Sequence, residues 1–166
     1  MDERQAIVDF IPRLRRYARA LVGDRSAADD LVQDTLERAW GKFHLYRVGT
    51  DLRAWLFTVM HNVYVNRVRA LRPTDVLTDD LPETAQRAAQ GDSLMVRDLD
   101  RALARLPQEQ REVLLLVALE DMSYEEAARA LDIPIGTVMS RLSRARERLR
   151  AMLLETPLSA KLTVVK

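Results

Sequence analysis

The sequence predicts an all-α protein made of two small helical domains. Alanine, leucine and arginine are abundant and only 5 glycines occur among 166 residues, a composition that favours helix. Apolar residues recur every three or four positions along most of the chain, which is the period of amphipathic helices. The stretch 73–92 interrupts this pattern with prolines and acids. We therefore expect a domain at 1–72, a linker at 73–92, a domain at 93–155 and a tail at 156–166.

Three helices are predicted in the first domain. The first covers 4–22, where apolar residues form one stripe. The second spans 26–43, and the hydroxyl of Ser26 can cap its N-terminus. A loop at 44–50 leads to the third helix, at 51–71. The alternative to a linker after this helix is a long surface loop within one domain. A structureless loop of about twenty residues is uncommon in a compact domain, so we prefer the boundary.

The second domain begins with two predicted helices, at 94–106 and 108–119, separated by Pro107. Residues 113–119 are all apolar. Such a run is too continuous for one face of a surface helix, so we expect it to form the core of this domain.

The stretch 123–142 is the most informative part of the chain, because it has the pattern of a helix-turn-helix. Ser123 and Glu126 have the spacing of a capping box, which begins the first helix. Asp132 tolerates the left-handed conformation that can end it. Pro134 fixes its own φ and stiffens the turn. The second helix is expected to begin directly after this proline.

The second helix of this motif has two distinct faces. Val138, Leu142 and Ala145 begin an apolar stripe, and hydroxyls and arginines occupy another arc. Arginine and hydroxyl side chains can bind base edges or phosphates. The alternative is a surface helix whose arginines are simply solvated. The predicted DNA contacts are Thr137, Ser140 and Arg141 to bases, and Arg144 and Arg148 to phosphates.

The net charge of +1 conceals an uneven distribution of charge. Residues 53–72 carry four arginines and no acid, and residues 129–150 carry six arginines and two acids, so each stretch has a net charge of +4. The predicted linker carries five acids and one arginine, a net charge of −4. Two basic regions on either side of an acidic linker suit two separate contacts with nucleic acid.

Several classes of function have no supporting motif in the sequence. The chain has no cysteine, which excludes disulfides and thiolate metal sites and fits a reducing cytoplasm. No apolar run approaches the roughly 20 residues of a membrane span, and no signal-peptide core is evident at the N-terminus. No nucleophile, metal-ligand or phosphate-loop motif occurs. We therefore expect no enzyme activity, no catalytic residue, no metal and no cofactor.

Three segments in this order resemble the extracytoplasmic-function sigma factors of bacteria, the minimal type that has only the second and fourth sigma domains. The segments are 29–40, 52–62, and 106–113 taken together with 140–146. The likeness covers roughly residues 5–153. It implies a subunit without a catalytic centre that directs RNA polymerase to promoters, and it implies that the helix-turn-helix reads the minus-thirty-five element.

The resemblance also implies roles in the first domain. Its second helix is expected to dock on the clamp helices of the largest subunit of core RNA polymerase, and its loop and third helix are expected to read the minus-ten element. For Leu31 and Trp40, burial in the core is an equal alternative. The expected core-binding residues are Asp30, Leu31, Gln33, Asp34, Arg38 and Trp40. The expected minus-ten residues are Tyr46, Arg47, His61, Asn62, Arg67 and Arg69.

Two residues depart from the pattern of the family. His61 stands where an arginine is common, and Asn66 stands where an aspartate is common. The departures leave the fold unchanged and bear on which minus-ten sequence is read, and a surface histidine is the alternative for His61. Trp55 is expected to pack in the core.

The partners that the resemblance implies are core RNA polymerase, promoter DNA and an anti-sigma factor, with no small-molecule substrate. It implies a cytoplasmic protein, which an anti-sigma factor can hold at the inner membrane. Two rival functions remain. One is a helix-turn-helix regulator that binds DNA without polymerase, and the other is a sigma mimic that sequesters an anti-sigma factor.

Overall fold

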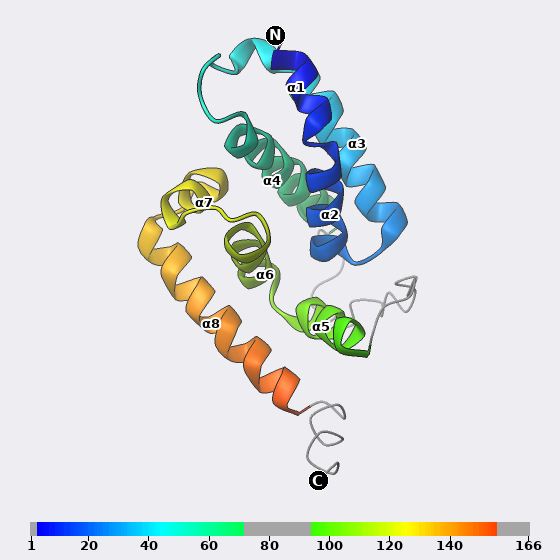
Figure 1. The fold of residues 1–166 in the computed structure, drawn as a ribbon, viewed down its shortest axis with the longest axis vertical. Helices are drawn as coiled ribbons and strands as arrows, with labels where there is room; N and C mark the ends of the chain where they lie inside the picture. The colour runs from blue at the N-terminus through cyan, green and yellow to red at the C-terminus, as the bar shows by residue number, and fades with distance from the viewer. Residues whose placement is uncertain (1–2, 72–93, 156–166) are drawn as a thin grey trace.

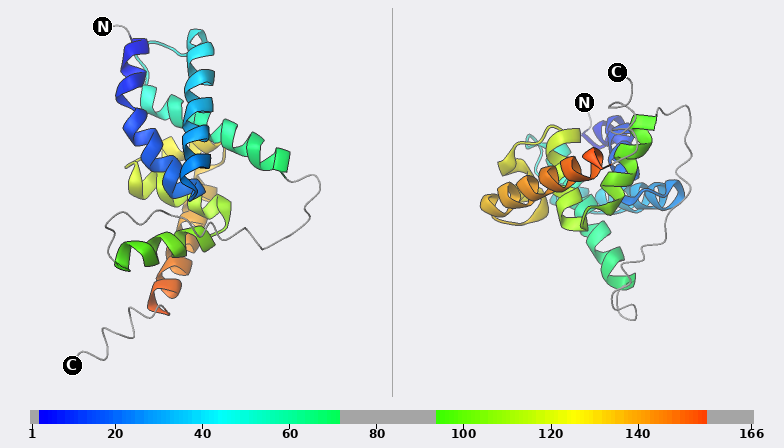
Figure 2. Two further views of the ribbon diagram at one scale, coloured as in Figure 1. Left: turned by 90° about the vertical axis from the view of Figure 1, so that its right-hand side faces the viewer. Right: turned by 90° about the horizontal axis from the view of Figure 1, so that it is seen from below.

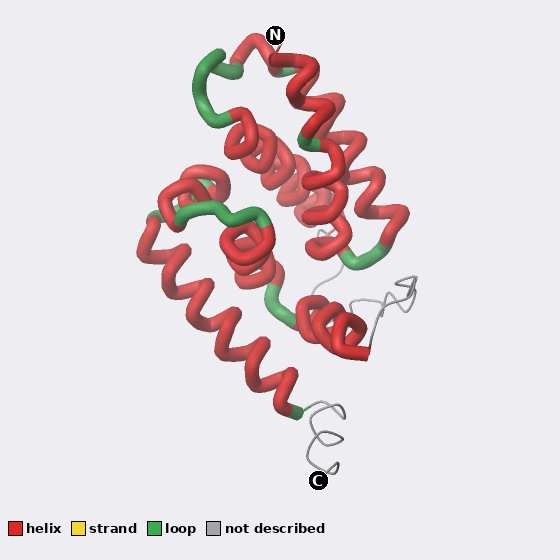
Figure 3. Tube along the Cα trace, in the orientation of Figure 1, coloured by secondary structure: helices red, strands yellow, loops and turns green. Residues whose placement is uncertain are grey.

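The computed structural model describes residues 3–71 and 94–155, and within these ranges every regular element is helical (Figures 1 and 3). The all-α prediction is therefore confirmed for this part of the chain, and the predicted linker and tail lie outside it. The elements of the first domain are α1 (Glu3–Asp9), α2 (Ile11–Val22), α3 (Arg25–Gly41), η1 (Phe43–Leu45) and α4 (Leu52–Leu71). Those of the second are α5 (Leu94–Arg105), α6 (Gln108–Leu114), η2 (Leu115–Leu119), α7 (Tyr124–Leu131) and α8 (Ile135–Leu154).

The first predicted helix is divided in the structure. It breaks at Phe10, whose amide donates to the carbonyl of Ile7 over 3.0 Å and closes a turn between α1 and α2. Pro12 in the first turn of α2 explains the break, because its ring would clash with the carbonyl four residues earlier in a continuous helix. A stripe of apolar residues therefore does not exclude an interruption within it.

The predicted N-cap of the next helix is also corrected. Asp24 caps α3 by accepting a hydrogen bond of 3.0 Å from the amide of Ala27, and Ser26 lies inside the helix. Gly23 ends α2 with a φ of 86°, a conformation that favours glycine. Asp24 directly follows this glycine, and its carboxylate caps the helix two residues earlier than the hydroxyl of Ser26 would.

The helix predicted at 108–119 changes its winding partway. It is α-helical to Leu114 and continues as the π-helical turn η2, in which the amide of Glu120 donates to the carbonyl of Leu115. Residues 113–116 are buried, as predicted for a core segment, whereas Ala118 is exposed.

The helix-turn-helix prediction is confirmed. Ser123 and Glu126 form both hydrogen bonds of the capping box at the start of α7. Asp132 ends α7 in the left-handed conformation, and α8 begins at Ile135 directly after Pro134. Val138, Leu142 and Ala145 form the buried stripe of α8.

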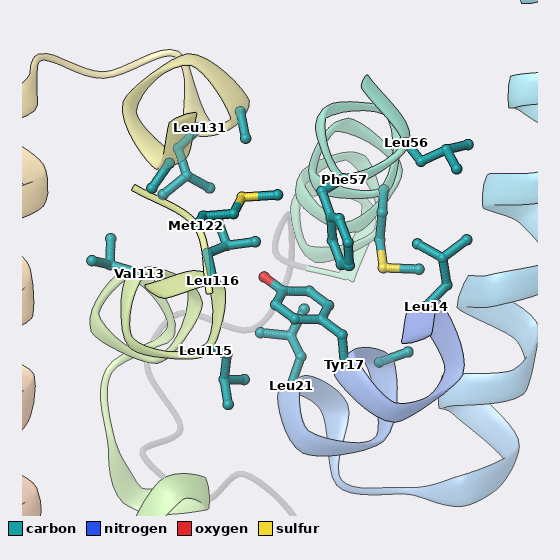
Figure 4. Packing of buried hydrophobic residues seen from close by; sticks show 14 of the residues in the cluster. Leu14, Tyr17, Leu21, Leu56, Phe57, Val113, Leu115, Leu116, Met122 and Leu131 are labelled. Carbon is teal, nitrogen blue, oxygen red and sulfur yellow. The ribbon is translucent and has the colours of Figure 1, made fainter. Parts of the chain in front are cut away.

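The two domains pack against each other. Helix α4 lies against α7, and α2 lies against α5 and η2. Tyr17 and Leu21 of the first domain face Leu115 and Leu116 of the second (Figure 4), within one cluster of buried apolar side chains. Figure 2 shows that the last turns of α4 project beyond this packed body. The first turns of α4 thus face the second domain, and its last turns extend into solvent.

Candidate nucleic-acid and polymerase interface

Helix α8 presents most of its predicted DNA contacts to solvent. Ser140, Arg144 and Arg148 are exposed, and Thr137 is partly buried. The hydroxyl of Ser140 donates to the carbonyl of Thr137 over 3.3 Å, so that its oxygen can still accept a hydrogen bond. These side chains lie on the side of α8 away from its buried stripe. The arrangement offers hydroxyls near the start of the helix and cations farther along it.

Arg141 lies at the edge of this face and not at its centre. Its side chain is 27% exposed, and its Nη2 atom lies 3.6 Å from a carboxylate oxygen of Glu109 on α6. The predicted contact of Arg141 to a base stays a prediction.

Residues that sequence reasoning missed occupy the same exposed face. Met139 is 51% exposed beside Ser140, and Ser143 is exposed one turn farther on. Gly136 lies in the first turn of α8, where an added Cβ would meet no atom within 4 Å. A helical wheel that scored every position off the buried stripe, and not only the polar ones, would have found them.

The predicted minus-ten residues on α4 divide into two groups. Asn62 and Arg69 are exposed. Arg67 is partly buried and pairs with Asp34 of α3. His61 faces the second domain, where its Nδ1 atom lies 2.5 Å from the Oε2 atom of Glu112. In this arrangement His61 is neither a surface histidine nor a side chain presented to DNA.

The structure of the loop before α4 differs from the prediction for Tyr46. Tyr46 is buried, its ring centroid lies 5.3 Å from that of Trp55, and its hydroxyl donates to the carbonyl of Thr50 over 2.6 Å. In this structure the ring is therefore not available to stack on a base, because it packs against Trp55, which is partly buried against the core. Arg47 is exposed in the same loop.

The predicted polymerase-binding residues on α3 form an exposed polar face with one exception. Asp30, Gln33, Asp34 and Arg38 are exposed. Trp40 is 47% exposed, and the guanidinium of Arg4 lies 5.6 Å from its ring centroid. Leu31 is only 1% exposed, so in this structure it packs in the core, which is the alternative that the sequence left open for it.

A set of polar contacts between the two domains also escaped sequence analysis. Nη2 of Arg16 donates to Glu120 over 3.0 Å. Arg53 donates to the backbone carbonyl of Glu120 and to the carboxylate of Glu126, each over 2.9 Å. Arg111 of α6 donates to the carbonyl of Leu21 over 2.8 Å. These pairs are at least 67 residues apart in sequence, and no local pattern identifies such partners.

Two pKa shifts accompany this packing. Burial raises the pKa of Tyr17 well above its usual value, and the nearby Glu112 adds to the effect. The pKa of Glu126 is lowered, mainly because the backbone amide of Ser123 donates to its carboxylate, and Arg53 contributes. The Glu126 carboxylate therefore stays ionised at the interface at neutral pH.

The described ranges contain no cluster of three or more acidic or histidine side chains that could hold a metal ion. Among the helices of those ranges, none is long and apolar enough to cross a membrane.

Comparisons with known proteins match both domains. The family model for the Sigma2 domain of PhyR matches residues 7–61, and the model for sigma-70, region 4, matches residues 97–149. The ECF RNA polymerase sigma factor EcfG of Rhodopseudomonas palustris (strain TIE-1) is 38% identical over 152 residues, which cover 90% of this chain and 84% of that protein. The corresponding SigM of Bacillus subtilis (strain 168) is 32% identical over 82% of this chain and 86% of its own length.

Solved structures agree with these matches. The sigma factor RpoE of Bartonella quintana, in complex with the anti-sigma factor NepR, superposes with a TM-score of 0.78 and 36% identity, over 91% of this chain and 96% of that chain. The anti-anti-sigma factor PhyR of the same organism has a TM-score of 0.60 and 19% identity, over 87% of this chain and 49% of that chain, which supports the fold alone. With both sigma domains matched in order along most of its length, the chain belongs to the ECF RNA polymerase sigma factors.

Proposed function

We propose that α8 reads the minus-thirty-five element and that α4, with the loop before it, reads the minus-ten element. The observation that carries this proposal is the exposed face of α8, where Ser140, Arg144 and Arg148 lie together on the second helix of a helix-turn-helix. Such helices enter the major groove, where hydroxyls and guanidinium groups bind bases and phosphates. Asn62, Arg69 and the exposed Arg47 would supply the contacts of the first domain.

The exposed face of α3 is the proposed docking site for core polymerase. Asp30, Gln33, Asp34 and Arg38 would form charged and polar contacts, and Trp40 would bury its ring on binding. The catalytic centre belongs to the polymerase in this scheme, so the chain is not itself an enzyme and acts in the cytoplasm. Control by an anti-sigma factor fits the structural match to RpoE bound to NepR.

A second candidate function is a sigma mimic that sequesters an anti-sigma factor. The match of residues 7–61 to the Sigma2 domain of PhyR favours this candidate. The exposed arginines of α8 favour the sigma factor, because a mimic that never binds DNA has no need of them.

Transcription in vitro with core polymerase tests the proposal. The wild-type chain should start transcription at defined promoters, and Arg144→Ala should reduce the yield about tenfold while core binding is retained. Arg146→Ala is the matched control, because it removes the same charge from an exposed position on another side of α8. No transcription with any promoter, despite binding to an anti-sigma factor, would favour the mimic instead.

A further inference from the structure

Trp40 is the only aromatic side chain in the described ranges that is exposed. It leaves a large apolar surface in contact with water, and tryptophans in such positions are enriched where proteins bind one another. Gln33 lies seven residues earlier, about two turns along the same side of α3. Trp40 therefore lies at the end of the α3 face that is proposed to dock on core polymerase.

A cation from another helix lies against the ring of Trp40. The guanidinium of Arg4 in α1 is 5.6 Å from the ring centroid of Trp40 and 5.2 Å from that of Phe43. A guanidinium at this distance is attracted by the electrons of each ring face. The ring of Phe43 packs on the core, with its centroid 5.5 Å from that of Tyr46 and 6.3 Å from that of Trp55. Arg4 thus connects an exposed ring to a group of rings that the core holds in place.

This contact limits the movement of an otherwise unsupported ring. Within the described ranges, no other aromatic ring lies against Trp40. An exposed side chain without neighbours samples several rotamers, and their loss on binding costs conformational entropy. A ring that Arg4 already holds loses less freedom when a partner covers it. The contact therefore prepares Trp40 for binding.

The start of α1 lies beside η1, at the end of the first domain where α3 finishes (Figure 1). Arg4 is itself exposed, so a partner that covers Trp40 also removes water from the guanidinium. Attraction between a cation and a ring is stronger when the pair is desolvated. Val8 follows Arg4 by about one turn on the same side of α1 and is 44% exposed. It adds apolar area to this end of the domain.

We propose that Arg4 is a positioning residue for the binding of core polymerase, and that the docking site extends from α3 onto the side of α1 that carries Arg4 and Val8. Arg4 acts through the ring of Trp40. The matching surface of the polymerase is apolar, because Trp40 and Val8 are apolar and the charge of Arg4 is directed at two rings. The proposal rests on the proposed function in one respect, namely that the α3 face binds core polymerase.

Competition between an unlabelled full-length variant and labelled wild-type chain for limiting core polymerase tests the role of Arg4. Arg4→Gln should bind about fivefold more weakly, because the amide has no charge to hold the ring. Arg4→Lys should bind within about twofold of the wild type, because an ammonium group keeps the attraction. Arg13→Gln is the matched control, since it removes the charge of an exposed arginine on α2 of the same domain. Its affinity should not change.

A double-mutant cycle shows whether Arg4 acts through Trp40. Trp40→Leu should weaken binding about tenfold, and Arg4→Gln should cause no further loss in that background. Acrylamide quenching of tryptophan fluorescence in the free chain gives a second readout. Arg4→Gln should increase the quenching and Arg13→Gln should not, because the other tryptophan, Trp55, is partly buried. Circular dichroism should show the same helical content for all of these proteins.

Two results would overturn the role of Arg4. The first is equal affinity of Arg4→Gln and Arg13→Gln for core polymerase. The second is an equal loss from Arg4→Gln in the wild-type and Trp40→Leu backgrounds. The proposed docking face fails by a different result, namely unchanged affinity of both Trp40→Leu and Gln33→Ala, and the role of Arg4 then fails with it.

Discussion

The helices proposed to read DNA in the two domains differ in what covers them. Helix α8 leaves Ser140, Arg144 and Arg148 exposed. Helix α4 has His61 and Arg53 bound to the second domain. The surface of α8 is thus complete once its own domain has folded, whereas that of α4 depends on how the domains are arranged. Whether a proposed DNA-binding side chain is exposed therefore depends on the packing of the other domain as well as on the sequence of its own helix.

The largest expected effect is a loss of stability at Arg111, which bonds to both domains. Arg111 is buried and donates to the carbonyls of Leu21, Leu103, Ala104 and Leu106. Arg111→Ala removes the guanidinium that donates to these four carbonyls, and we expect the free energy of unfolding to fall by at least about 3 kcal/mol. Urea denaturation measures the change. The exposed Arg105→Ala should change it by less than about 0.5 kcal/mol, and an equal loss in both variants would contradict the role of Arg111.

The next effect concerns how α8 binds the DNA backbone. Arg148 is exposed and is proposed to bind a phosphate, so Arg148→Ala should weaken holoenzyme binding to all promoters alike. The slope of log affinity against log salt concentration should also fall by about one. Filter binding over a range of salt concentrations measures both quantities. An unchanged slope, as expected for the exposed control Arg150→Ala, would show that Arg148 does not contact phosphate.

A smaller effect distinguishes α4 from α8. Asn62 is exposed on α4, and we expect Asn62→Ala to weaken binding of the holoenzyme to a complete promoter by about 1–3 kcal/mol. Binding to a duplex that carries only the minus-thirty-five element should not change. Gel-shift titration with the two duplexes compares them. A loss on both duplexes would mean that Asn62 acts through the fold and not through the minus-ten element.

The smallest effect concerns Met139, whose exposed thioether side chain can contact the methyl group of a thymine. Met139→Ala should weaken binding to a thymine-containing minus-thirty-five element by about 1 kcal/mol. Replacement of each thymine by deoxyuridine removes only the methyl group, and at one position it should weaken the wild type but not the variant. Equal responses of both proteins at every position would exclude this contact.

Features that depend on neighbouring residues could be predicted from the sequence. The capping box of Ser123 and Glu126, the left-handed Asp132 and the buried stripe from Val138 all follow from local spacing, and the structure confirms them. The two domains follow from the prolines and acids that separate two periodic regions.

Features that depend on distant residues could not be predicted in this way. The residue types of Leu31 and Tyr46 show that their side chains are apolar or amphipathic, but they do not show which neighbours cover them. The partner of His61 is 51 residues away, and that of Arg16 is 104 residues away. Such pairs arise only when the two domains pack, so they require the three-dimensional structure.

Tethered cleavage of promoter DNA most directly tests the claim that one chain places two domains on two separated elements. Because the chain has no cysteine, Ser143→Cys on α8 or Asn66→Cys on α4 can carry a DNA-cleaving iron chelate at a single exposed site. In a holoenzyme–promoter complex, we predict cuts near the minus-thirty-five element from position 143 and near the minus-ten element from position 66. Cuts from both positions within the same few base pairs, or cuts from neither, would contradict the account.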